Sequence, residues 1–140
     1  MSLLAGLLAI IFALLAVLHL YWAFGGRWAA DAAIPKRPDG SRLFIPGTGG
    51  CLVITGGLAA FAFFCLRHAA LAPNLPPTFH WPARGLLLGM AGIFTLRAIG
   101  DFRYFGLFPR VVGTDFSALD RKLYTPLCAG LAGALLWLAL

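Results

Sequence analysis

Residues 3–24 read LLAGLLAIIFALLAVLHLYWAF, an apolar run that contains no Asp, Glu, Lys or Arg. A helix needs about 20 such residues to cross a hydrocarbon core of about 30 Å, so this run predicts a membrane-spanning helix. No basic residue precedes it and no small-x-small cleavage motif follows it closely, so we expect a permanent helix and not a cleaved signal peptide. The expected fold class is therefore an all-α membrane protein.

Three more apolar stretches follow, and together they predict spans at about 3–24, 48–67, 82–101 and 123–140. Of the 140 residues, 61% are hydrophobic and only 11% are charged, which leaves too little polar surface for a water-soluble globule. We therefore predict one domain over residues 1–140, a four-transmembrane-helix bundle. Similar intervals from His19 to Cys51 and from Arg97 to Cys128 suggest two duplicated helical hairpins.

Small residues recur along the predicted spans, and helices in lipid approach one another closely where such residues meet. Gly56 with Ala60, and Ala129 with Gly133, have the spacing of such contact faces. We expect these faces to close a compact bundle. They could equally dock other membrane subunits, and the residues do not separate the two uses.

Basic residues lie mainly in the loops between the spans. The first loop has Arg27, Lys36, Arg37 and Arg42, the third has Arg103, Arg110, Arg121 and Lys122, and the second has only Arg67 and Arg84. The positive-inside rule then places loops one and three in the cytoplasm and both termini outside. The net charge of +6 is dispersed between spans and forms no single patch, so no nucleic-acid partner is expected.

The third span is too short to cross a membrane without Arg97. If Trp81 marks the outer interface, about 20 residues carry the helix to Gly100 and leave Arg97 about one turn inside. Asp101 follows at i+4 and Tyr104 at i+7, so we expect one polar face on which Arg97 pairs with Asp101. A charge within a span points to a functional site, whereas an arginine that snorkels to lipid headgroups is the alternative.

Two further features fall on the same inner face as Arg97. His19 lies at a similar depth, with Trp22 at i+3, although a lone histidine is more often a packing residue than a ligand. Glycines ahead of the second span precede a helix N-terminus, where free N–H groups favour an anion. Donors and cations could thus converge on one anionic group. The predicted ligand-binding residues are His19, Trp22, Gly47, Gly49, Gly50, Arg97, Asp101, Arg103, Tyr104 and Tyr124.

Motifs for catalysis or metal binding are absent from the sequence. No HxxxH, clustered Cys and His, Gly-x-Ser-x-Gly or Walker A pattern occurs, so no metal, cofactor or catalytic residue is predicted. The chain has no glutamate, and Asp101 is the only aspartate that we expect near the membrane core. Asp115 is expected to cap a short interfacial helix, with Phe116, Leu119 and Leu123 on one face.

The segments HLYW (19–22), RAIGDFRYFGLF (97–108) and DRKLYTPLC (120–128) resemble an uncharacterised family of short bacterial four-helix membrane proteins. The resemblance covers nearly the whole chain, and residues 97–108 are its most specific part. It implies a multi-pass protein of the bacterial inner membrane with a domain of unknown function. It implies no mechanism.

Three functions remain open from the residues. The first is binding of an anionic lipid headgroup or a small amphipathic ligand in a polar pocket at the cytoplasmic face. The second is an accessory subunit of a larger membrane complex, docked through the small-residue faces. The third and weakest is a membrane enzyme or quinone-handling protein that uses His19 and Asp101. An enzyme is less expected than a binding protein.

Overall fold

In the computed structural model, which describes residues 2–69 and 83–140, the chain is built of helices and loops. The first half contains α1 (Ser2–Ala23), α2 (Ala30–Ala33) and α3 (Thr48–His68). The second contains α4 (Ala83–Ile99), α5 (Asp115–Leu119) and α6 (Thr125–Ala139), with a π-helical turn over Asp120–Tyr124 between the last two. Two isolated bridges, Lys36 to Arg42 and Gly100 to Gly106, are the only β-type pairings within these ranges. The predicted all-α class is confirmed for the described residues.

Three helices are long and apolar enough to cross a membrane: Ser2–Ala23, Thr48–His68 and the continuous helix Asp115–Ala139. They match the predicted spans at 3–24, 48–67 and 123–140. The 17 residues of α4 fall within the predicted span 82–101, whose first residue lies outside the described part, as does Trp81. The chain therefore has the helices of a membrane protein, and a fourth crossing stays a prediction.

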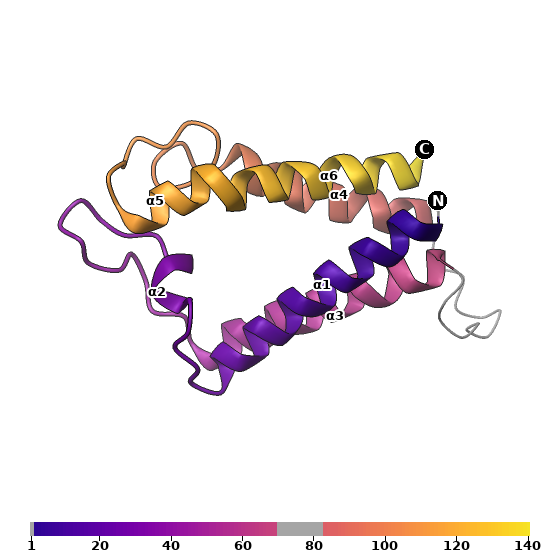
Figure 1. The fold of residues 1–140 in the computed structure, drawn as a ribbon, viewed down its shortest axis with the longest axis horizontal. Coiled ribbons are helices and arrows are strands. Elements are labelled where there is room, and N and C mark those ends of the chain that lie inside the picture. Colours follow the sequence, from indigo (N-terminus) through magenta and orange to yellow (C-terminus); the bar gives the residue numbers. More distant parts are fainter. Residues whose placement is uncertain (1, 70–82) are drawn as a thin grey trace.

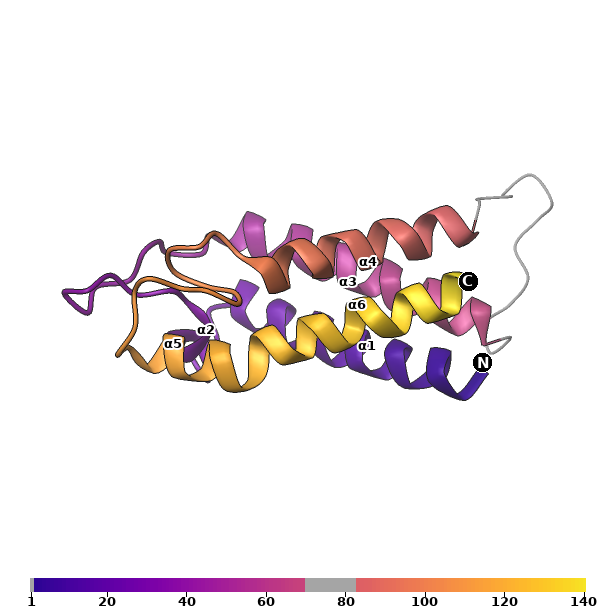
Figure 2. The same ribbon diagram turned by 90° about the horizontal axis from the view of Figure 1, so that it is seen from above.

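The long helices pair as two hairpins, α1 with α3 and α4 with α6. Figure 1 shows the hairpins as two layers that meet near the start of α1 and the end of α6 and diverge towards α2 and α5. Figure 2 shows the long helices running along one common direction, with α2 and α5 together at the far end. The pairing agrees with the predicted hairpins, but their divergence means that a closed four-helix bundle stays a prediction.

Three phenylalanines join the hairpins where the two layers meet. The ring centroid of Phe12 in α1 lies 5.7 Å from that of Phe61 in α3 and 5.4 Å from that of Phe94 in α4. Phe12 is completely buried. Aromatic pairs at such distances stabilise a structure by about 0.5–1.5 kcal/mol beyond the burial of their surface, so the pairs that Phe94 forms with Phe12 and Phe61 help to hold the hairpins together.

The small residues of the predicted contact faces lie on the outside of the hairpins. Gly56, Ala60, Ala129 and Gly133 are all exposed. A Cβ atom added to Gly56 or Gly133 would meet no atom of the described residues within 4 Å. Buried alanines take the close-packing role instead, among them Ala9, Ala62, Ala91 and Ala132. The expectation that the glycine faces close the bundle is therefore wrong for this structure.

The short helix before the last span differs in detail from its prediction. Thr114, not Asp115, is the N-cap of α5, because its hydroxyl accepts from the Ser117 N–H while the Ser117 hydroxyl accepts from the Thr114 N–H. Phe116 is buried, but Leu123 is 51% exposed. The π-helical turn accounts for this difference, since its extra residue shifts the helical register after Leu119.

Candidate ligand-binding site

The last turn of α4 carries Arg97, and its partner comes from the π-helical turn. Arg97 Nη2 donates to Asp120 Oδ1 at 2.6 Å. The Asp120 side chain is only 1% exposed, whereas that of Arg97 is 30% exposed. The guanidinium also lies 4.5 Å from the centroid of the Phe105 ring, a cation–π contact. Arg97 thus joins α4 to the helix that follows the third loop.

Asp120 also accepts two hydrogen bonds at its second oxygen. The Gly106 backbone N–H donates to Oδ2 at 2.8 Å, and the Thr125 hydroxyl donates at 3.1 Å. A buried carboxylate is stable only when it is paired and its remaining lone pairs are satisfied, and Asp120 meets both conditions. Asp120 is therefore the aspartate that is buried within the protein, whereas Asp101 is exposed. The expected depth of Asp101 near the membrane core stays a prediction.

Asp101 does not pair with Arg97. The helix ends at Ile99, and Gly100 has the left-handed backbone angle φ of 80°, so the i+4 relation across this point does not hold. Asp101 Oδ1 instead accepts from the backbone N–H groups of Arg103, Tyr104 and Phe105, at 2.9, 2.7 and 3.1 Å. These three bonds engage the carboxylate with the backbone of its own loop.

Two glycines close the loop that Asp101 organises. Gly100 and Gly106 face each other in an isolated bridge, with φ of 80° and 101°. A Cβ atom at Gly100 would overlap the carbonyl oxygen of Phe105, and one at Gly106 would overlap that of Ile99. Only glycine fits these two positions, because the backbones touch and the angles disfavour any side chain. The segment 97–108 therefore forms a compact loop, from which the Gly106 N–H donates to Asp120.

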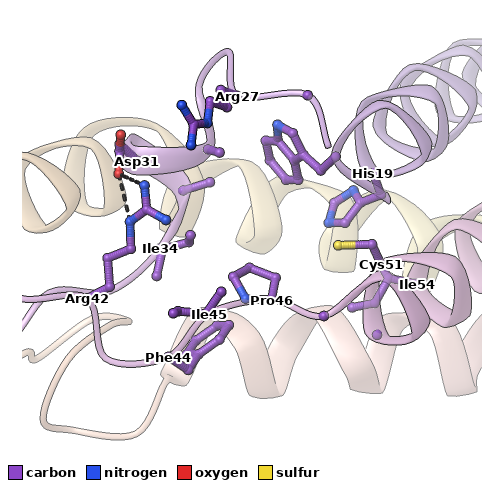
Figure 3. Close-up of a pocket in the computed structure, with 16 residues that line it drawn as sticks. His19, Arg27, Asp31, Ile34, Arg42, Phe44, Ile45, Pro46, Cys51 and Ile54 are labelled. Carbon is purple, nitrogen blue, oxygen red and sulfur yellow. Dashed lines mark hydrogen bonds and ion pairs between the residues drawn. The ribbon is translucent and has the colours of Figure 1, made fainter. Parts of the chain in front are cut away.

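A cavity of about 710 Å³ lies in the first hairpin, at the end where the two layers diverge. This volume falls within the range of about 300–1,000 Å³ that is usual for small-molecule sites. Figure 3 shows its labelled walls: His19 and Cys51 lie at one side, Arg27, Asp31 and Arg42 at the other. The lining residues are His19, Trp22, Gly26, Arg27, Ala30, Asp31, Ala33, Ile34, Arg42, Phe44, Ile45, Pro46, Gly47, Gly50, Cys51 and Ile54.

Positive charge exceeds negative charge in this pocket. Arg42 pairs with Asp31 through its Nε, at 2.8 Å from Oδ1, and through Nη2. Arg27 also lines the pocket, and no described acid forms an ion pair with it. With His19 neutral, the lining side chains carry two positive charges and one negative charge. An anion therefore meets one uncompensated guanidinium and the remaining N–H groups of Arg42.

His19 and Trp22 form one wall of the pocket from the last turns of α1. Nδ1 of His19 lies 2.8 Å from the carbonyl oxygen of Leu15; because that oxygen only accepts, Nδ1 carries the proton. Nε2 of the neutral ring is then left as an acceptor. The Trp22 ring meets the His19 ring edge to face at 4.9 Å, and its N–H donates to the Trp28 carbonyl at 2.9 Å. Hydrogen bonds within the protein thus set both the tautomer of His19 and the orientation of the Trp22 ring.

The other predicted residues fall in three places. Gly47 and Gly50 line the pocket at the start of α3, whereas Gly49 is exposed and does not. Arg103 stacks on the Tyr104 ring at 5.2 Å in the loop after α4, away from the pocket lining. The Tyr124 hydroxyl donates to the Ala32 carbonyl in α2 at 3.3 Å. The ten residues therefore do not form one site, since His19, Trp22, Gly47 and Gly50 line the pocket and the other six do not.

Four residues of the structure were not predicted as site residues from the sequence: Arg27, Asp31 and Arg42 in the pocket and Asp120 in the ion pair. A signal for Asp120 exists, because it follows the buried Phe116 by one helical turn and so shares its face. No comparable signal marks the loop residues. In the described ranges, no group of three His, Cys, Asp or Glu could hold a metal ion, and the three cysteines are free.

A family model described as a protein of unknown function, DUF3995, matches residues 12–135. The match includes every residue that lines the pocket and both partners of the Arg97–Asp120 pair. No curated protein and no solved structure matches the chain significantly. The comparisons therefore establish a family without an activity.

Proposed function

The chain belongs to the DUF3995 family, whose function is unknown, and from the geometry of its own residues we propose that it binds the headgroup of an anionic amphiphile. The binding site is the pocket between α1, α2, the loop that follows α2, and the start of α3. One juxtaposition carries the proposal: the unpaired Arg27 faces the same cavity as the apolar side chains of Phe44 and Ile45.

The two kinds of lining suit the two parts of an amphiphile. Arginine presents a planar fork of N–H donors that matches the oxygens of a phosphate or carboxylate. Phe44 and Ile45 are 53% and 81% exposed, so they offer apolar surface for the first carbons of an acyl chain. His19 Nε2 can accept from a hydroxyl of a polyol headgroup. A glycerophospholipid with a polyol headgroup therefore fits best.

The proposed membrane placement puts this pocket at the inner surface of the bacterial plasma membrane. The basic loops one and three lie at the pocket end of the molecule, and the positive-inside rule assigns that end to the cytoplasm. In this arrangement α4 and flanking residues form the fourth crossing, and both termini lie outside. Anionic lipids are attracted to basic surfaces at this side, which brings the ligand to its site.

Substituting the unpaired arginine tests the proposal. Arg27→Gln is expected to weaken binding of dihexanoylphosphatidylglycerol by roughly tenfold, because a hydrogen bond to a charged group contributes about 1.5–3 kcal/mol. Calorimetric titration of the purified protein measures the Kd. Arg37→Gln is the matched control, since Arg37 is exposed in the same loop but does not line the pocket. Equal Kd values for the two variants would refute the proposal.

The outward glycine faces favour a second candidate function, that of a subunit docked against a partner helix. Gly56 and Ala60 are exposed on α3 at the spacing that lets two helices in lipid approach closely. The third alternative, an enzyme that uses His19 with Asp101, loses its support. Asp101 is engaged with the backbone of its own loop and does not line the pocket of His19.

Bulky substitutions on that face separate the second function from the first. Gly56→Leu with Ala60→Leu is expected to convert a complex into free monomer on a native gel in mild detergent, because the added side chains keep a partner helix away. Ala13→Leu on α1, which adds the same bulk at an exposed alanine outside that face, is the control. A wild-type protein that migrates as a monomer would exclude the subunit function.

A further inference from the structure

One wall of the pocket is the short helix α2. Ala30, Asp31 and Ala33 of this helix line the cavity, and Asp31 pairs with Arg42 at the same side of it. With only four residues, α2 lies far below the length of about 12–15 residues at which an isolated helix becomes stable in water. Its place must therefore be set by contacts with the rest of the molecule.

Besides the Asp31–Arg42 pair, α2 has contacts with the second hairpin. α2 packs against α5, and in Figure 1 the two lie together where the layers are widest apart. The Tyr124 hydroxyl donates to the Ala32 carbonyl at 3.3 Å, between residues far apart in the sequence. Just beyond α2, Lys36 forms an ion pair with Asp115 at 3.5 Å, but Asp115 is 86% exposed and such surface pairs contribute little. Tyr124 is thus the better-placed polar link.

The Tyr124 ring itself is firmly held. It lies 6.1 Å from the ring of Phe116, which is 2% exposed, and it belongs to the π-helical turn that begins at Asp120. The Arg97 ion pair fixes that turn against α4. Among the described residues, none of the second hairpin lines the pocket, yet this hairpin holds α2, which forms part of the pocket wall.

We propose that Tyr124 is a positioning residue of the pocket: its hydroxyl holds α2 in place and thereby sets where Asp31 keeps Arg42. This inference rests on the proposed binding of an anionic amphiphile. If α2 is released, Asp31 and Arg42 shift together. The affinity for the anionic headgroup then falls, whereas the apolar wall formed by Phe44 and Ile45 is unchanged. The second hairpin thus takes part in ligand recognition without touching the ligand.

The variant Tyr124→Phe tests this role, since it keeps the ring against Phe116 and removes only the hydroxyl. We expect the Kd for dihexanoylphosphatidylglycerol to rise roughly fivefold, as for loss of one ordinary hydrogen bond. The Kd for zwitterionic dihexanoylphosphatidylcholine should change less. The ratio of the phosphatidylcholine Kd to the phosphatidylglycerol Kd should therefore fall. The midpoint of thermal unfolding without lipid should fall by only about 2–4 °C, the shift expected for the loss of about 1 kcal/mol in a chain of this size. Tyr104→Phe is the control, because its hydroxyl forms no hydrogen bond to the described residues.

Hydrogen exchange in the lipid-free protein adds a readout that does not depend on the ligand. Backbone amides of residues 29–34 should exchange faster in Tyr124→Phe than in the wild type, with residues 48–68 unchanged. If the wild type binds phosphatidylglycerol and Tyr124→Phe has the same Kd ratio, the positioning role is overturned and the proposed function stands. If the wild type does not bind phosphatidylglycerol, both proposals fall, whatever the exchange rates show.

Discussion

Asp120→Ala is expected to lower the free energy of unfolding by about 3 kcal/mol, at the lower end of the range for breaking a buried ion pair. The substitution leaves Arg97 without its partner, and it also leaves the Gly106 N–H and the Thr125 hydroxyl without an acceptor. The upper end of the range is not expected, because Arg97 is 30% exposed and can be partly hydrated. Chemical unfolding in detergent micelles, followed by circular dichroism, measures the change.

Two further variants show whether this loss comes from the unpaired charge. Asp115→Ala, five residues earlier in the same helix, removes an aspartate that is 86% exposed and should cost at most about 1 kcal/mol. Arg97→Leu combined with Asp120→Asn leaves no buried charge and keeps an oxygen for the Gly106 N–H, so it should be less harmful than Asp120→Ala. A loss in Asp120→Ala no larger than that in Asp115→Ala would contradict the structural role of the pair.

Gly106→Ala is expected to cost more than 2 kcal/mol, because it combines an unfavourable backbone angle with an overlap of atoms. At this residue φ is 101°, and an added Cβ would overlap the Ile99 carbonyl oxygen. The loop would have to open, and the Gly106 N–H would then leave Asp120. The same unfolding measurement, with hydrogen exchange of residues 100–106, reports both effects.

Gly113→Ala separates the two causes. Gly113 also has a positive φ, of 86°, but an added Cβ there would meet no described atom within 4 Å. It should therefore show only the backbone cost, about 1–2 kcal/mol. If Gly106→Ala and Gly113→Ala destabilise the protein equally, the close approach of the backbones at Gly100 and Gly106 is not important for stability.

The membrane helices were predictable because apolar length is a local property of the sequence. The run that starts at Leu3 requires no knowledge of its neighbours, and α1 ends within one residue of the predicted boundary at Phe24. The packing faces were not predictable in the same way. A glycine in a helix can lie at a close contact with another helix or on an open surface, and Gly56 lies on an open surface.

Arg97 illustrates what local spacing can and cannot provide. The short third span correctly indicated that this arginine needs a partner. The i+4 rule then selected Asp101, but Gly100 ends the helix before that rule applies. The true partner, Asp120, lies across a loop and a π-helical turn, and only the folded chain brings it to Arg97.

The pocket was predicted only on its helical side. His19 and Trp22 lie on α1 and Gly47 and Gly50 at the start of α3, where helix boundaries can be read from the sequence. Arg27 and Arg42 were interpreted only as topology signals, because a loop sequence does not show where the loop folds back. The local pairing of Lys36 with Arg42 and the Asp31 ion pair bring that loop over the cavity, and neither follows from a helix or strand period in the sequence.

Native mass spectrometry of the protein, purified in mild detergent from cells, tests the binding of an anionic amphiphile most directly. We expect one anionic phospholipid to remain bound to the wild type, enriched over its share of the membrane, and to be largely lost from Arg27→Gln but not from Arg37→Gln. Retention of lipids in proportion to the membrane composition, equally in all three proteins, would contradict a headgroup site in this pocket.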